Sequence, residues 1–173
     1  LFLNSDGTVK NSQEISDTKG NFGVIESNAA FGNAISNIGD LDGDGIVDLV
    51  VGSYGDSHNG YDSGAVFVIF LNIDGTVKSH QKISSIEGNF DVVLEVGDTF
   101  GTAVESIGDL DGDGIIDLAI GAQGDDDGKS FLPITLGGEA SSSKGAVYIL
   151  FMNNDGTVKS HQKISADYGN FHD

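Results

Sequence analysis

The sequence of 173 residues contains no cysteine, no tryptophan, no arginine and a single proline. The absence of cysteine excludes disulfide bonds and thiol chemistry. All eight basic residues are lysines scattered along the chain, so a nucleic-acid partner is not predicted. No apolar run approaches the roughly 18–20 residues that a membrane helix needs, so membrane insertion is not predicted either.

Acidic residues, in contrast, are abundant, and 27 of them against 8 lysines give a formal charge of −19. An apolar content of 38% is still sufficient for a hydrophobic core, so the chain is not a disordered acidic tail. Glycine occurs 26 times, well above its usual share, which suits a chain with many tight turns. The charge favours solubility and association with cations.

The acidic residues are concentrated in a doubled motif, GDLDGDGIVDL at residues 39–49 and GDLDGDGIIDL at residues 108–118. The two copies differ only where Val47 is replaced by Ile116. Each copy carries four aspartates at positions 1, 3, 5 and 9 of a loop. Carboxylates this close together repel one another unless a cation lies among them. The motif therefore predicts a cation site.

The aspartate motif lies within longer repeats. Residues 1–16, 69–84 and 150–165 are three copies of one segment, each with an N-x-D-G turn. Residues 31–56 and 100–125 are two copies of a second segment. The alternation of the two segments indicates duplication within a longer array.

Each repeat is predicted to form four β-strands, in the first repeat at residues 31–38, 48–52, 65–71 and 77–84. β-Branched and aromatic residues dominate these stretches, glycine, asparagine and aspartate separate them, and none shows a helical period. The third strand is apolar on both faces, so we expect it to be covered on both. The fourth carries alternating lysines and is expected at the sheet edge. Radial stacking of such small sheets gives a β-propeller.

Several short motifs recur at matching places in both repeats. They are the Phe-Gly pairs at 31–32 and 100–101, the D-x-D-x-D-G-x-x-D loops, the strands D-L-V-V-G and D-L-A-I-G, and the Gly-Ala steps at 64–65 and 145–146. Together they resemble the FG-GAP repeat, which builds the seven-bladed propeller of integrin α-chains and related bacterial and archaeal surface proteins. The usual Gly-Ala-Pro after the second strand is replaced by Gly-Ser-Tyr at 52–54 and Gly-Ala-Gln at 121–123.

The resemblance implies an all-β fold built from β-propeller blades of four antiparallel strands. We expect two complete blades plus an orphan outer strand, as part of a larger or assembled propeller. The expected divisions are an outer strand of a preceding blade (1–16), blade 1 with its leading loop (17–84), blade 2 with its leading loop (85–165) and the start of a connection to a next blade (166–173). Because propellers need about 4–8 blades, a segment of a longer polypeptide is favoured over self-assembly of short chains.

Calcium is the expected ion, because it takes six to eight oxygen ligands at about 2.3–2.6 Å. The predicted ligands are Asp40, Asp42, Asp44, the carbonyl of Ile46 and Asp48 in one site, and Asp109, Asp111, Asp113, the carbonyl of Ile115 and Asp117 in the other. Position 12, where an EF-hand needs glutamate, is Val51 or Ile120. Magnesium suits an all-protein oxygen cage less well. The alternative, a turn with solvated charges, is disfavoured because both copies keep every ligand.

Three further features are weaker candidates for a site. The aspartates at 125–127 are a candidate for a further cation site, although a solvated loop is the favoured interpretation. His80 and His161 are expected to be exposed strand residues, and the N-x-D-G turns to be structural. An enzyme is not predicted, because G-x-S-x-G, H-E-x-x-H and phosphate-binding glycine motifs are absent. Carboxylate pairs suited to glycoside hydrolysis remain compatible with the sequence.

A partner is expected at the blade end opposite to the calcium loops. The connections predicted there, residues 17–30, 54–63, 86–99 and 123–144, are the longest and the most variable. The candidate contact residues are Tyr54, Asp56, Phe131, Leu132 and Ile134. For the apolar run around Pro133, packing against a neighbouring blade is the equal alternative.

The sequence therefore predicts a calcium-binding FG-GAP module of an extracellular or cell-surface protein that mediates adhesion or binds a protein or glycan. Further blades or other copies of the chain are expected as partners. One alternative is a structural array that forms a stalk, sheath or filament by strand complementation, for which the spare strand at 1–16 argues. A non-catalytic module of a secreted hydrolase is the least favoured alternative.

Overall fold

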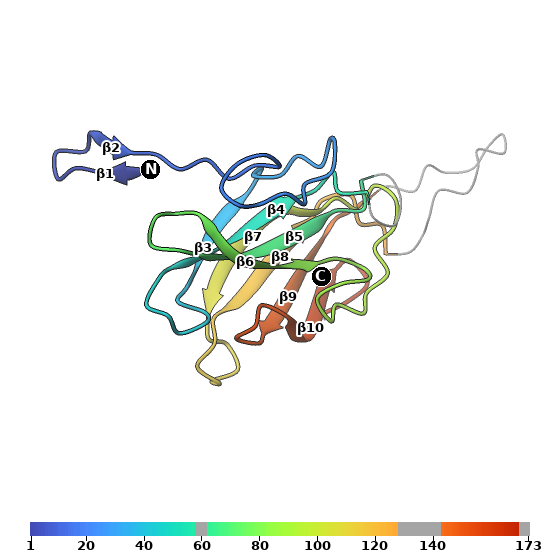
Figure 1. Cartoon of the computed structure of the whole chain (residues 1–173). Helices are drawn as coiled ribbons and strands as arrows, with labels where there is room; N and C mark the ends of the chain where they lie inside the picture. The colour runs from blue at the N-terminus through green and yellow to red at the C-terminus, as the bar shows by residue number, and fades with distance from the viewer. Residues whose placement is uncertain (58–61, 128–142, 170–173) are drawn as a thin grey trace.

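The computed structural model describes residues 1–57, 62–127 and 143–169. Every regular element in these ranges is a β-strand, and the strands form two four-stranded antiparallel sheets and one two-stranded hairpin. Figure 1 shows the two sheets packed together, with the N-terminal hairpin extending from one end of the molecule. The predicted all-β fold with four-stranded antiparallel sheets is confirmed.

In both sheets, strands that follow one another in sequence lie side by side. The first sheet consists of β3 (Ile35–Gly39), β4 (Asp48–Ser53), β5 (Ala65–Leu71) and β6 (Val77–Ile83). The second consists of β7 (Phe100–Gly108), β8 (Asp117–Ala122), β9 (Ala146–Met152) and β10 (Val158–Ser165). The hairpin consists of β1 (Phe2–Leu3) and β2 (Val9–Asn11).

The first strand of the first sheet begins at Ile35, so the predicted start at residue 31 is wrong. The equivalent β7 does begin at its phenylalanine, Phe100. The amide of Phe100 donates to the carbonyl of Ser63 at 3.1 Å, and Phe100 forms a parallel bridge with Gly64. Phe100 also pairs with Ala122 within its own sheet, so the residue has a backbone partner on each side. Among the described residues, Phe31 has no such preceding sheet to pair with.

Within residues 1–16, which were expected to be one outer strand, residues 2–11 form a hairpin of two short strands. Its contact with the first sheet lies at the turn between β5 and β6. A β-carbon added to Gly75 would lie 3.2 Å from the Phe2 ring and 3.3 Å from the β-carbon of Gln13. A β-carbon on Gly156 would likewise meet that of Gln81 at 3.2 Å. The hairpin thus touches the first sheet at the turn that contains Gly75, whereas the two sheets pack along β3, β4, β5 and β7.

The strand β5 is buried on both faces, as its apolar sequence predicts. Val66, Val68 and Phe70 join a core that includes residues of the second sheet. On the opposite face Phe67 packs with Phe22 and Phe31 of the leading segment, with ring centroids 5.6 and 5.7 Å away. Phe90, Phe100 and Tyr148 repeat this aromatic trio in the second sheet, with centroids 5.0–5.6 Å apart.

The two sheets approach each other at backbone distance near Gly52 and Gly64. A β-carbon added to Gly52 would lie 2.1 Å from the carbonyl oxygen of Gly101. Gly64, which has a φ of +90°, would meet the carbonyl oxygen of Phe100 at the same distance. A side chain at either position would therefore separate the sheets, which explains why both positions are glycine.

We predict that Gly52→Ala lowers the free energy of unfolding by about 3 kcal/mol, because the added methyl group forces the sheets apart. Gly121 is the matched control, since it occupies the equivalent position in β8 and a β-carbon there would have the methyl group of Ala103 as its nearest neighbour, at 3.2 Å. Gly121→Ala should cost less than about 1 kcal/mol. Urea unfolding measures both values, and equal costs would contradict the proposed role of Gly52.

Candidate metal centre

The two aspartate loops occupy equivalent places, one between β3 and β4 and the other between β7 and β8. Gly43 and Gly45 have φ values of 77° and 88°, which residues with a side chain rarely adopt. Gly112 and Gly114 have values of 79° and 90° in the second loop. These glycines let the chain turn sharply enough for alternate side chains to face one centre.

Three carboxylates meet in each loop. Oxygen atoms of Asp40, Asp42 and Asp48 all lie within 4.8 Å of one another, and so do those of Asp109, Asp111 and Asp117. Two oxygens bound to one calcium ion at about 2.4 Å lie at most about 5 Å apart, so these clusters have suitable dimensions. The donors are all hard oxygen atoms, which calcium prefers. Each cluster therefore fits the expected ion.

The fourth predicted carboxylate of each loop is not part of the cluster. The Oδ1 atoms of Asp44 and Asp113 accept the amides of Ile46 and Ile115 at 2.9 Å. Their Oδ2 atoms accept hydrogen bonds from lysines, as described below. The ligand roles of Asp44 and Asp113, and of the Ile46 and Ile115 carbonyls, therefore stay predictions.

The last aspartate of each loop is buried and ties the loop to the sheet. Asp48 accepts the amide of Leu41 on one oxygen and that of Leu71, at the end of β5, on the other, both at 3.0 Å. Asp117 accepts the amides of Leu110 and Met152 at 2.8 and 3.1 Å. Burial raises the pKa of Asp48, although these amides act in the opposite direction.

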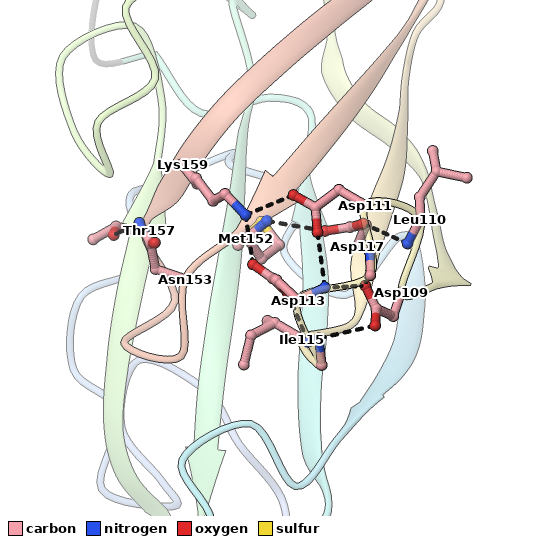
Figure 2. A network of polar contacts seen from close by, with 12 residues as sticks. Asp109, Leu110, Asp111, Asp113, Ile115, Asp117, Met152, Asn153, Thr157 and Lys159 are labelled. Carbon is pink, nitrogen blue, oxygen red and sulfur yellow. Dashed lines mark hydrogen bonds and ion pairs between the residues drawn. The ribbon is translucent and has the colours of Figure 1, made fainter.

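A lysine from the outer strand reaches into each loop. Lys78 Nζ lies 2.7 Å from Asp42 Oδ2 and 2.5 Å from Asp44 Oδ2. Lys159 Nζ lies 2.6 and 2.5 Å from the equivalent oxygens of Asp111 and Asp113. Figure 2 draws both contacts as dashed lines. The hydrogen bonds raise the pKa of both lysines.

Lys78 and Lys159 were not predicted as part of the site, since alternating lysines were expected only to mark the sheet edge. Their signal is the dipeptide Val-Lys that follows each N-x-D-G-T turn, at 77–78 and 158–159. Both strands carry a register shift at this point, so Lys78 and Lys159 have no opposite residue in the pairing. A bulge of this kind re-aims a side chain, which alternation alone does not reveal.

The aspartates at 125–127 are not a solvated loop, so that interpretation is wrong. Asp125 is buried, accepts a hydrogen bond from the Tyr148 hydroxyl at 2.7 Å and pairs with Lys163 at 2.6 Å. Lys163 also lies 3.0 Å from Asp127. Burial raises the pKa of neighbouring Asp98 to about 6, and the charge of Asp125 acts in the same direction.

The other candidates are placed as follows. His80 is exposed as expected, but His161 is partly buried, with Nδ1 3.6 Å from Asp91. Tyr54 lies at the surface, whereas Asp56 is buried and pairs with Lys82 at 2.9 Å. Phe131, Leu132 and Ile134 lie outside the described residues.

The N-x-D-G turns keep a structural hydrogen-bond pattern. The amide and the hydroxyl of Thr76 both donate to Asp74 Oδ1, at 3.0 and 2.6 Å. Asp6 and Asp155 accept the same pair of bonds in their turns.

Comparison with protein families now identifies the repeat. The model of the FG-GAP repeat matches residues 31–69, which include the first aspartate loop, β4 and most of β5. The chain contains an FG-GAP repeat. The resemblance noted from the sequence is therefore confirmed, and the two four-stranded sheets are propeller blades, called blade 1 (β3–β6) and blade 2 (β7–β10) below.

Relatives share part of this sequence at moderate identity. Integrin alpha-2 of Mus musculus is 40% identical over 99 residues, which are 56% of this chain and 8% of the relative. Integrin alpha-M of Mus musculus is 32% identical over 94 residues, 54% of this chain and 8% of the relative. Phosphatidylinositol-glycan-specific phospholipase D of Bos taurus is 31% identical over 127 residues, 73% of this chain and 14% of the relative. The chain thus spans only a small part of each relative.

We predict that the buried cluster around Asp98 makes stability depend on pH. The pKa of Asp98 is about 6 in the folded protein against 3.8 as its ordinary value, so protons bind more tightly to the folded state. This group should therefore stabilise the fold as the pH falls from about 7.5 to about 5. Urea unfolding in chelator should show a smaller increase over that range for Asp98→Asn than for the unmodified protein. Parallel curves would contradict the assignment.

Proposed function

We propose that this chain is a pair of calcium-binding FG-GAP blades from an extracellular or cell-surface protein that binds a protein or glycan. The observation that carries the proposal is the twofold occurrence of one carboxylate cluster at the same place in two blades. A solvated turn has no reason to keep four acidic side chains in one small loop twice, because their mutual repulsion is unfavourable. A divalent ion removes that repulsion in both loops.

The extracellular setting is supported by the chemistry of the loops. The outer carboxylates of each cluster are exposed, and such open sites in extracellular modules bind calcium in the range of about 10⁻⁴–10⁻³ M. Calcium at that concentration is characteristic of the space outside cells. The integrin relatives argue in the same direction. The described part of the chain offers no helix of the length and hydropathy that a membrane crossing requires.

The partner is proposed to bind at the rim opposite to the metal loops. Tyr54 lies there, directly after β4, and lines a hollow with Asn33, Thr102 and Gln123 at the junction of the two blades. An exposed tyrosine among amide and hydroxyl groups suits protein and glycan ligands, since it offers both a flat apolar face and a hydrogen-bonding group. The metal ions would hold the scaffold without touching this ligand.

A binding role is favoured over catalysis, although one relative is named as a phospholipase. The loop carboxylates are engaged by backbone amides and lysines, as Asp40 and Asp42 illustrate. The buried Asp125 is held by Tyr148 and Lys163. Acidic groups held in this way are suited to structural roles and to metal binding, so we assign the chain no chemical step.

Further FG-GAP repeats are proposed to cover the outer faces of both blades. Leu41 and Val66 of blade 1, which face blade 2, are 6% and 0% exposed, but the equivalent Leu110 and Val147 are 60% and 40% exposed. The reverse holds on the other side, where Val104 is 7% exposed and the equivalent Ile35 is 60% exposed. The exposed face of blade 2 thus corresponds to the face of blade 1 that is buried between the blades, and the exposed face of blade 1 corresponds to the buried face of blade 2. Successive repeats of an array require such a match.

A structural array remains the second candidate function, and the hairpin β1–β2 favours it. This hairpin repeats the β5–β6 turn and contacts blade 1 near Gly75, where the outer part of a preceding blade is expected. In an assembly of separate chains, it would complete a blade that another copy begins. Assembly of separate chains and a longer continuous chain would both bury the same two surfaces, the outer face of blade 1 and the outer face of blade 2.

The calcium proposal predicts two binding sites per chain, each with a Kd of about 0.1–1 mM. In calorimetric titration of chelator-treated protein, Asp42→Ala should remove one site and Asp111→Ala the other. Asp74→Ala is the control, because Asp74 lies in an N-x-D-G turn outside the clusters and its loss should leave both sites. The proposal fails if the unmodified protein takes up no calcium or if the double variant still binds two ions.

The array proposal predicts that a chain lengthened by another copy of residues 85–165 after Ser165 unfolds at a higher urea concentration. Leu110→Lys should cost the lengthened chain about 2 kcal/mol, because Leu110 becomes buried against the added repeat. The same substitution should have little effect in the 173-residue chain, where Leu110 is exposed. Ile73→Lys, at an exposed turn, should be neutral in both. An equal effect of Leu110→Lys in both chains would refute coverage of this face.

A further inference from the structure

The lysines that enter the aspartate loops affect how tightly the loops bind an ion. This inference rests on the proposed calcium function. Each lysine contacts the oxygen atoms that the loop backbone leaves open. Asp42 uses Oδ1 for the amide of Asp44, and Asp44 uses Oδ1 for the amide of Ile46. The Oδ2 atoms of both aspartates point to Lys78 Nζ. The ammonium group therefore lies on the side where a metal ion would find free ligand atoms.

The position of this lysine is built into the fold. In β6, Val77 lies opposite Leu71 and Ser79 lies opposite Phe70, so Lys78 is the extra residue of a bulge. In β10, Lys159 is likewise skipped between Val158 and Ser160. Figure 2 shows Lys159 reaching from its strand across to Asp111 and Asp113. In each blade, a bulge in the outer strand thus places a lysine at the equivalent position of the aspartate loop.

An ammonium group and a calcium ion compete for these oxygens. The second aspartate of each loop, Asp42 or Asp111, belongs to the three-carboxylate cluster. Its Oδ1 already accepts a backbone amide, so the Oδ2 atom that the lysine contacts is the one left for an ion. The lysine supplies one positive charge and relieves part of the repulsion when no metal is bound. A bound calcium ion supplies two and repels the lysine at such a short distance.

We propose that Lys78 and Lys159 are tethered counter-cations that keep each loop folded without metal and are displaced when calcium binds. Calcium must break the two ion pairs of the lysine, so its affinity is lower than the carboxylates alone would give. The same lysine prevents the empty loop from opening through charge repulsion. The loop therefore keeps its shape over a range of calcium concentrations while remaining responsive to the ion.

The test uses the full chain with Asp111→Ala, so that only the first loop binds calcium, and adds Lys78→Met. Calorimetry should show a Kd for calcium that is roughly fivefold lower, the size expected for removal of an exposed pair of charge interactions. Urea unfolding in chelator should show a lower midpoint for Lys78→Met, whereas the midpoint in saturating calcium should be unchanged. A lysine that only supports the fold would lower both midpoints equally.

Lys10→Met in the same background is the matched control. Lys10 occupies the equivalent bulge in β2, between Val9 and Asn11, and forms no ion pair with the described residues. This variant should leave the Kd unchanged. If Lys78→Met does not fold, the variant Lys159→Met with Asp42→Ala tests the same displacement in the second loop.

Three results would overturn the proposal. If the background protein binds calcium but the Kd of the lysine variant is unchanged or higher, displacement of the lysine is rejected and the proposed calcium function stands. An equal fall of both unfolding midpoints rejects it in favour of a structural role. Absence of calcium binding in the unmodified protein rejects the proposed function as well, so the two failures are distinguishable.

Discussion

The buried aspartate at the end of each loop is the interaction on which the rest of the site depends. One oxygen of Asp48 holds the loop at Leu41, and the other holds the end of the adjoining strand at Leu71. A buried carboxylate is costly unless it is hydrogen-bonded, so these amides and the aspartate require one another. The loop is thereby fixed relative to the sheet, and its outer carboxylates face a defined point. The convergence of the three carboxylates therefore follows from a constraint of folding.

The contact between the blades explains why the family signature contains so many glycines. Gly52 and Gly64 of blade 1 allow the backbone of Phe100 and Gly101 to approach, and Phe100 then pairs with blade 1. The Phe-Gly pair of one repeat and the Gly-Ala step of the preceding repeat are thus two halves of one contact. This contact forms only between two repeats, so neighbouring repeats stabilise each other.

Much of this architecture could be predicted from the sequence because it depends on local patterns. The burial of β5 follows from its two apolar faces, and the aspartate clusters follow from their spacing. Lys78 could not be placed, because its direction depends on a bulge that is defined only by pairing with β5. Alternation assigns it to the same face as Lys82, but a one-residue change of register reverses such assignments. Asp125 was misjudged because its partner Lys163 lies 38 residues away in the sequence.

Each blade uses the two lysines of its outer strand to balance acidic groups at opposite ends of the sheet, but the two balances differ in burial. Lys78 and Asp42 are 39% and 23% exposed, so water and ions reach their pair. Lys82 and Asp56 are 11% and 1% exposed, so breaking that pair would leave a charge buried. Breaking a buried pair leaves an uncompensated charge in the interior, whereas an exposed pair loses less when a competing cation replaces one partner. Under the proposed calcium function, the exposed pair at the aspartate loop is the one that an ion can replace, whereas the buried pair at the opposite end of the sheet stays in place.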